Sequence, residues 1–268
     1  MDLSVVSDEL SEDFQTAVEI AYSWGLCKFE IRNAWLARVP NIPATGIEII
    51  KSVIKKYNII ITALSPGIFK IPLHSEEMVY HKVEILLKTF DLARELDTES
   101  VTIFGVHRSP SDSSEDYQEF LNNIGGAVEL AEKEGIVLML ENEAGCWADT
   151  GNNTARIVRE IGNPALRINW DPGNAFTAGE IPYPDGYAAV RGRVANVHIK
   201  MAARDSERKI HYLEGSGGYL DLKGQIGALK VDNYEDYIAL ETHHEPRVEE
   251  SRRCLEIVRK AIRDCNGI

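Results

Sequence analysis

The chain has 268 residues, of which 44% are hydrophobic and 26% are charged. This composition is typical of a soluble globular protein, and a single α/β barrel commonly fills about 250 residues. The formal net charge of −13 disfavours nucleic acid and anionic membrane surfaces as partners but leaves small anionic substrates open.

The N-terminus has no basic segment followed by a long apolar one, so we expect no signal peptide. No stretch approaches the roughly 18 apolar residues of a membrane span. The four cysteines form no C-x-x-C pair and are expected to be reduced thiols in a cytoplasmic protein. The sequence is compatible with a homo-oligomer.

Short apolar runs alternate with longer amphipathic runs along the whole chain. The apolar runs predict eight strands, in chain order at about residues 3–7, 28–32, 58–64, 101–106, 137–141, 166–170, 194–200 and 237–241. The amphipathic runs predict eight helical segments, one between Ser11 and Gly25 and the others at about residues 45–56, 75–96, 114–134, 152–161, 186–191, 222–230 and 246–265. Ser11 is the expected N-cap of the first helix, and residues 65–74 and 201–221 are expected to be loops.

The repeated strand and helix pattern predicts the fold class. Eight βα units without a dividing linker predict a single domain over residues 1–268, an α/β fold of the closed (β/α)8 TIM-barrel type. The alternative is a doubly wound open sheet, which usually has fewer strands and a glycine-rich phosphate loop after the first one. Residues 7–9, which follow the first expected strand, contain no glycine.

Four of the expected strands end in side chains that bind metals. Glu141, Asp171 and Glu241 end the fifth, sixth and eighth strands, and His198 lies near the end of the seventh. In a barrel these carboxyl ends meet at one mouth. A strand-end Glu alone usually pairs with a cation, and a lone His is usually a core residue. Three converging acids would repel one another, however, so the set favours one divalent cation, Mn²⁺, Co²⁺, Zn²⁺ or Mg²⁺.

The strand ends resemble those of the xylose isomerase-like barrels, a family with sugar isomerases, ketose epimerases, inosose dehydratase and endonuclease IV. The resemblance rests on Leu140-Glu141-Asn142-Glu143, Trp170-Asp171-Pro172-Gly173-Asn174, Val197-His198-Ile199-Lys200 and Leu240-Glu241-Thr242-His243. It implies that Glu141, Asp171, His198 and Glu241 bind one divalent metal. It also implies that Arg204 binds substrate, because ketose epimerases have an Arg six residues after the metal His.

Two positions depart from the family pattern. Asn174 stands where many members have a His, and an amide is a poor ligand for transition metals, so a second metal is disfavoured. Lys200 stands where endonuclease IV needs a further ligand. Together with the net charge, this disfavours a nuclease acting on DNA.

Further residues are expected to contact the substrate. Asn174 offers an amide to a hydroxyl group, and His243 either binds substrate or supports the site. Lys200 either binds a substrate anion or neutralises Asp171 or Glu241. Lys70 follows the third strand and either lines the mouth or is a solvated surface residue.

The leading functional hypothesis is a metal-dependent isomerase or epimerase of a free or phosphorylated sugar, working through a metal-stabilised enediolate. Glu141 and Glu241 would be the catalytic residues, one taking a proton from carbon and the other returning it. An inosose dehydratase-like lyase would share the first step. The remaining alternatives are an endonuclease IV-like nuclease and a barrel that binds sugar without catalysis.

Overall fold

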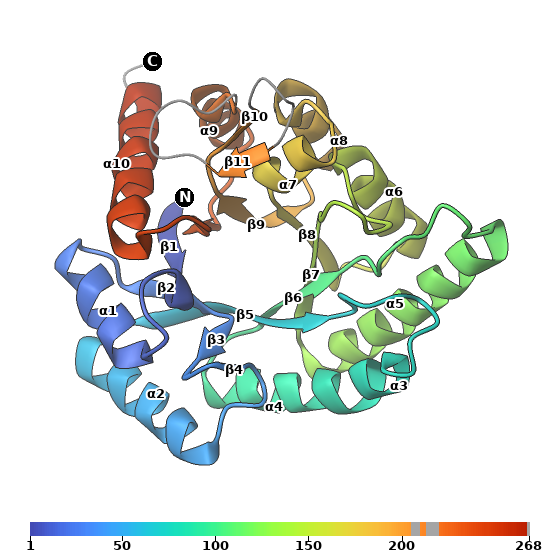
Figure 1. The fold of residues 1–268 in the computed structure, drawn as a ribbon, viewed down its shortest axis with the longest axis horizontal. Coiled ribbons are helices and arrows are strands. Elements are labelled where there is room, and N and C mark those ends of the chain that lie inside the picture. Colours follow the sequence, from blue (N-terminus) through green and yellow to red (C-terminus); the bar gives the residue numbers. More distant parts are fainter. Residues whose placement is uncertain (205–209, 213–219, 267–268) are drawn as a thin grey trace.

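The computed structural model describes residues 1–204, 210–212 and 220–266, and of residues 202–204, 210–212 and 266 the backbone alone. Within these residues, eight parallel strands close into a barrel that helices surround, which confirms the predicted TIM barrel (Figure 1). The barrel strands are β1 Asp2–Val6, β2 Lys28–Ile31, β5 Ile60–Ile68, β6 Ser100–Phe104, β7 Val137–Glu141, β8 Leu166–Trp170, β9 Val194–Ile199 and β12 Tyr237–Leu240. Each strand pairs with its neighbours in the chain, and β12 closes the barrel against β1.

The helices form the outer ring in Figure 1. They are α1 Phe14–Ser23, α2 Ala44–Tyr57, α3 Met78–Tyr80, α4 Leu86–Glu95, α5 Ser114–Glu134, α6 Gly151–Ile161, α7 Pro172–Thr177, α8 Tyr187–Val190, α9 Leu222–Val231 and α10 Arg247–Asn266. The helix expected over residues 75–96 is divided into α3, a π-helical turn at His81–Ile85 and α4. The helix predicted at residues 114–134 agrees with α5 at both ends, because a capping residue and Gly135 mark its limits.

Two details at helix starts differ from expectation. Asp13, not Ser11, caps α1, since its Oδ1 accepts a hydrogen bond from the Thr16 amide at 2.8 Å. Helix α7 was not predicted, because Pro172 and Gly173 resemble turn residues in sequence. Proline is nevertheless favoured in the first turn of a helix, where its missing N–H removes no bond.

Two antiparallel hairpins follow barrel strands where loops were expected. The first pairs β3 Asn33–Ala34 with β4 Ala37–Arg38 directly after β2. The second pairs β10 Ala202–Arg204 with β11 Ile210–Tyr212 after β9. Strand β5 also continues to Ile68, into the loop expected at residues 65–74. All three features extend from carboxyl ends of strands, so they build the mouth of the barrel.

The barrel interior is partly polar beneath this mouth. The hydroxyl groups of Ser4 and Thr62 are hydrogen-bonded to each other at 3.1 Å. Glu30, Asn196 and His198 are also buried. The apolar core lies between the strands and the helices and includes Phe14, Phe29, Phe90, Phe120 and Trp170. The strands therefore present apolar side chains to the helices and polar ones to the site.

Two further findings concern the whole described chain. None of its helices is both long enough and apolar enough to cross a membrane. The four cysteines are free, with Cys27 exposed and Cys146, Cys254 and Cys265 buried.

Replacement of Ser113 by alanine should weaken helix α5. Ser113 Oγ accepts from the Asp116 amide at 3.2 Å, and Asp116 Oδ2 accepts from the Ser113 amide at 2.8 Å. Loss of this capping box should lower the free energy of unfolding by about 1 kcal/mol, measured by urea denaturation. Ser114→Ala is the matched control, because its hydroxyl bonds only the neighbouring Glu115, and it should change stability by less than about 0.5 kcal/mol. Equal losses in the two variants would contradict the capping role.

Candidate metal centre

The structure brings the four predicted ligand residues together at the mouth. Glu141, Asp171, His198 and Glu241 come from the ends of β7, β8, β9 and β12, and all four are buried. One ligand atom from each lies within 4.8 Å of the others. Ligands on opposite sides of a metal with bonds of about 2.0–2.2 Å are roughly 4.0–4.4 Å apart. A small inward movement would therefore suffice to hold one ion.

Asp171 is positioned by the start of helix α7. Its Oδ1 accepts from the Asn174 amide at 2.8 Å as the N-cap, which leaves Oδ2 facing the centre. Asn142 holds the Asp171 backbone on both sides, with bonds of 2.8 Å to its N–H and 2.7 Å to its carbonyl. Burial raises the pKa of Asp171 against the opposing charge of Lys200.

His198 is oriented by Glu30 of β2. Its Nε2 lies 2.9 Å from Glu30 Oε2, a contact that places the proton on Nε2 and the lone pair on Nδ1. Nδ1 has no hydrogen-bond partner among the described residues. It faces Glu241 Oε2 at 3.3 Å and Glu141 Oε1 at 3.7 Å. An imidazole nitrogen without a partner, directed at carboxylates, is the arrangement that a metal site needs.

The pKa of His198 supports the same conclusion. Burial acts to lower this pKa, yet the charges of Glu30, Glu141 and Glu241 hold it well above the ordinary value. The negative charges of these carboxylates thus favour a positive charge on the His198 ring. A divalent cation would supply that charge in place of the proton.

The two glutamates of the centre are held by different kinds of donor. Glu141 accepts from two neutral amides, Asn169 Nδ2 at 3.1 Å and Asn174 Nδ2 at 3.2 Å. Glu241 accepts from two cations, Arg32 Nη1 on Oε1 and Lys200 Nζ on Oε2, both at 2.7 Å. Burial alone would raise the pKa of Glu241, but Lys200, His198 and His243 hold it well below the usual range. These cations therefore stabilise the charged form of Glu241.

Lys200 lies inside the centre, not at its edge. Its Nζ is 2.7 Å from both Asp171 Oδ2 and Glu241 Oε2, so it neutralises the two acids between which the sequence left the choice open. The stem fits because residue 173 is glycine, where a Cβ would lie 2.6 Å from Lys200 Cγ. One divalent cation and the Lys200 ammonium together balance the three carboxylates of the centre. The charges therefore fit one metal ion.

A second acidic group adjoins the centre and already contains a cation. One ligand atom each from Glu9, Glu241 and His243 lies within 4.8 Å of the others. Arg32 occupies this group, with Nη2 2.8 Å from Glu9 and 2.9 Å from Asp8. His243 Nδ1 is 2.8 Å from Glu9 and its Nε2 is 3.4 Å from Glu241, so it supports the site through these acids.

The other predicted substrate contacts lie at different depths. Asn174 contacts Glu143 at 3.3 Å as well as Glu141. Lys70 is partly exposed, 3.1 Å from Glu143 and stacked over the Phe104 ring. Arg204 ends β10, and its side chain is outside the described part of the structure, so its contact with substrate stays a prediction.

Sequence reasoning missed Glu30, Asn142 and Asn169, which orient the ligands. An acidic residue inside the short strand Lys28–Ile31 was a usable signal, because a buried charge needs a partner. The amides carried no comparable signal. Their partners lie on other strands and become visible only when the barrel closes.

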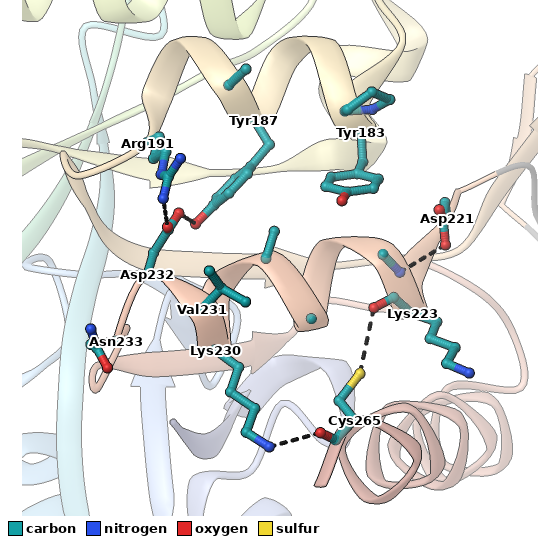
Figure 2. A pocket seen from close by; sticks show the side chains of 15 residues that line it. Tyr183, Tyr187, Arg191, Asp221, Lys223, Lys230, Val231, Asp232, Asn233 and Cys265 are labelled. Carbon is teal, nitrogen blue, oxygen red and sulfur yellow. Dashed lines mark hydrogen bonds and ion pairs between the residues drawn. The ribbon is translucent and has the colours of Figure 1, made fainter. Parts of the chain in front are cut away.

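A separate groove of about 970 Å³ lies outside the barrel, between α8 and α9 (Figure 2). Some of its polar groups are bonded to each other: Tyr187 donates to Asp232 at 2.8 Å, and Lys230 donates to the Cys265 carbonyl at 2.7 Å. Arg191 is also paired with Asp232. The groove is lined by none of the four candidate ligand residues.

Comparison with known sequences identifies relatives of the chain. The sequence model of the family described as "Xylose isomerase-like TIM barrel" matches residues 18–260. Over 152 residues the chain is 24% identical to a 3-dehydroshikimate dehydratase of Bacillus anthracis, covering 55% of this chain. The match spans 53% of that relative, about half its length.

Solved structures with other activities share the fold. A D-allulose 3-epimerase from Methylomonas sp. in complex with D-allulose has a TM-score of 0.76 at 17% identity, over 97% of each chain. The IOLI protein with a zinc atom has a TM-score of 0.80 at 14% identity, over 99% of this chain and 98% of that one. At such identities the likeness concerns the fold.

Acid should remove the contribution of Glu9 to stability. Burial would raise the pKa of Glu9, but its hydrogen bond to His243 and the charges of His243 and Arg32 lower it to about 2, from the ordinary 4.5. A carboxyl with a lowered pKa stabilises the fold fully above the unfolded value, and the stabilisation is lost as the pH falls through the folded value. The destabilisation caused by Glu9→Gln should therefore be full above about pH 4.5 and shrink toward pH 2.

Denaturant unfolding of the wild type and the variant between these pH values checks this expectation. Glu119→Gln, an exposed position on α5, is the control and should show no such pH dependence. A Glu9→Gln effect that is constant over the range would contradict the argument.

Proposed function

Since the chain belongs to the xylose isomerase-like TIM barrel family, we propose that it is a divalent-metal-dependent isomerase or epimerase of a sugar or sugar phosphate. The observation that carries the proposal is the buried set Glu141, Asp171, His198 and Glu241, with an unpartnered His198 Nδ1 directed into it. These four residues would hold the ion. When bound, the ion would polarise the substrate carbonyl and acidify the neighbouring C–H.

Glu141 is the better placed of the two glutamates to take the proton from carbon. Among the described residues its oxygens accept from the neutral amides of Asn169 and Asn174, and its ion pair with His198, at 3.7 Å, is longer than the 2.7 Å pairs of Glu241 with Arg32 and Lys200. Asn174 fixes its direction, and Glu143 in turn holds Asn174. Glu241 would act from the other side, returning a proton to the opposite face or to the neighbouring carbon.

A lyase is the second candidate, and the Lys200–Glu241 pair favours it. An ammonium 2.7 Å from Glu241 provides a hydrogen-bond donor where a leaving hydroxyl group would lie. Glu141 would take the same proton, the C–O bond would break, and the leaving hydroxide would take a proton from Lys200 to form water. The similarity to a dehydratase over half of the chain agrees with this alternative.

One experiment separates the two candidates. The full chain with added Mn²⁺ is incubated in deuterated buffer with a panel of sugars, sugar phosphates and polyhydroxylated ketones. Mass spectrometry and NMR then follow each compound. Deuterium at carbon without loss of water identifies an isomerase or epimerase, and a product lighter by one water identifies a lyase. If no compound exchanges hydrogen at carbon or loses water, both proposals are wrong.

Metal binding should depend on the contact between Glu30 and His198. We expect one divalent ion per chain by elemental analysis. Glu30→Gln should lower metal affinity by about 10–100-fold in a competition titration, because an outer-shell partner sets the orientation and basicity of the ligand. Glu143→Gln is the control, since it removes a charge at the same mouth without touching His198, and its effect should be much smaller. Equal affinities in the wild type and Glu30→Gln would contradict the role of Glu30.

Removal of the carboxylate at Glu141 should abolish most turnover. Glu141→Gln and Glu241→Gln should each lower kcat by at least about 10²-fold, the scale of general acid–base catalysis, while circular dichroism shows an intact fold. Metal content is measured in each variant, because loss of the ion would give the same result. A metal-loaded Glu241→Gln variant with nearly full turnover would make Glu241 a ligand only.

A further inference from the structure

Arg38 ends the β3–β4 hairpin at the mouth, and its guanidinium rests on a glycine of β5. A Cβ added to Gly67 would lie 2.9 Å from Arg38 Nε and 3.0 Å from Cζ, so any other residue there would displace the guanidinium. Gly67 also has a φ of +77°, which favours glycine. Arg38 Nε donates to the Ser65 carbonyl at 3.1 Å. The contact with Gly67 and the hydrogen bond to Ser65 thus hold the Arg38 guanidinium in one orientation.

The terminal nitrogens of Arg38 are left without a carboxylate. Within the described residues, none forms an ion pair with Arg38, although Asp8, Glu141 and Glu241 are near enough to influence its pKa. Burial lowers that pKa, and the charge of Arg32 adds to the effect. Arg32 differs in that it pairs with three acids at once. A half-buried guanidinium whose terminal donors have no carboxylate among the described residues can bind an incoming acceptor.

The position of Arg38 relative to the metal centre indicates what that acceptor is. The four candidate ligands come from β7, β8, β9 and β12, which are consecutive in the barrel. Arg38 lies by β2 and β5, in the other half of the mouth, and Lys70 follows β5 on the same side. A molecule bound at the centre and reaching across the mouth would meet these cations with its far end.

We propose that Arg38 binds an anionic group, a carboxylate or a phosphate, on the end of the substrate remote from the metal centre. This proposal rests on the proposed function, which places the reacting end of the substrate at the metal centre. Arg38 Nη1 and Nη2 offer the planar fork that binds two oxygens of such a group. The protein carries a net charge of −13, so an anionic substrate needs a local cation of this kind.

Titration of the Mn²⁺-loaded full chain with inorganic phosphate and with malonate tests the proposal without any turnover. Arg38→Met should weaken binding of the preferred anion by at least about tenfold, because a charged hydrogen-bonding pair is lost. Arg38→Lys keeps the charge but not the fork, and should lie between. Arg263→Met removes an exposed Arg on α10 and should bind like the wild type. The anion bound more tightly by the wild type distinguishes phosphate from carboxylate.

The outcomes separate this inference from the proposed function. Unchanged anion affinity in Arg38→Met and Arg38→Lys, or no binding by the wild type, overturns the role of Arg38, even if neutral sugars are converted. Arg38-dependent binding in a chain that converts no compound supports the subsite and counts against the enzyme proposal. Thermal unfolding is measured for each variant, and if Arg38→Met unfolds, the comparison rests on Arg38→Lys.

With an active substrate, a second readout applies. Arg38→Met should raise KM for the anionic substrate at least about tenfold and change kcat little, since the contact is remote from the reacting carbon. The KM of a neutral analogue should not change. Equal KM increases for the anionic and neutral compounds would contradict the subsite.

Discussion

The site depends on the balance of charge among buried carboxylates. Glu141, Asp171 and Glu241 lie close together in a region where an uncompensated negative charge is expensive. Lys200 compensates part of this charge through Asp171 and Glu241. Arg32 also pairs with Glu241 but is shared with Asp8 and Glu9, and the group of four could hold a further cation. The cationic side chains that the structure describes therefore neutralise only part of the negative charge of the site.

The barrel makes this concentration of charge structurally possible. Parallel strands place their carboxyl ends at one mouth, and each ligand is held by a contact to a neighbouring element. Asp171 is held by the start of α7 and by Asn142, and His198 by Glu30. Glu30 lies in β2 and Asn174 in α7, and Asn142 directly follows β7. Rigid elements thus keep like charges at distances they would not adopt in a flexible chain.

The mouth is asymmetric in two respects. Glu141 is held by amides and Glu241 by cations, so two residues of one type have different chemistry because of their neighbours. The ligands also occupy one half of the mouth, while Arg38 and Lys70 lie in the other half. Such polarity would bind a substrate in one direction, with its reacting carbon on the side of Glu141.

Local sequence was sufficient for much of the fold. Apolar periodicity located the eight barrel strands, and capping signals located both ends of α5. It was insufficient where a residue type is ambiguous: Pro172 begins α7 although proline usually indicates a turn. The hairpins at the mouth were missed for a similar reason, since two or three residues per strand are too few for a periodic pattern.

The sequence by itself determined which strands end in metal-binding side chains, because that order is covalent and strand ends can be located from local patterns. Only the tertiary structure decided how those side chains are paired. Glu30 meets His198 from 168 residues away, and Arg32 meets Glu241 from 209 residues away. Contacts between such distant residues depend on the closure of the barrel, which no local pattern records. For the same reason, no local pattern distinguishes Arg38 from other cations, and its contact with Gly67 appears only in the structure.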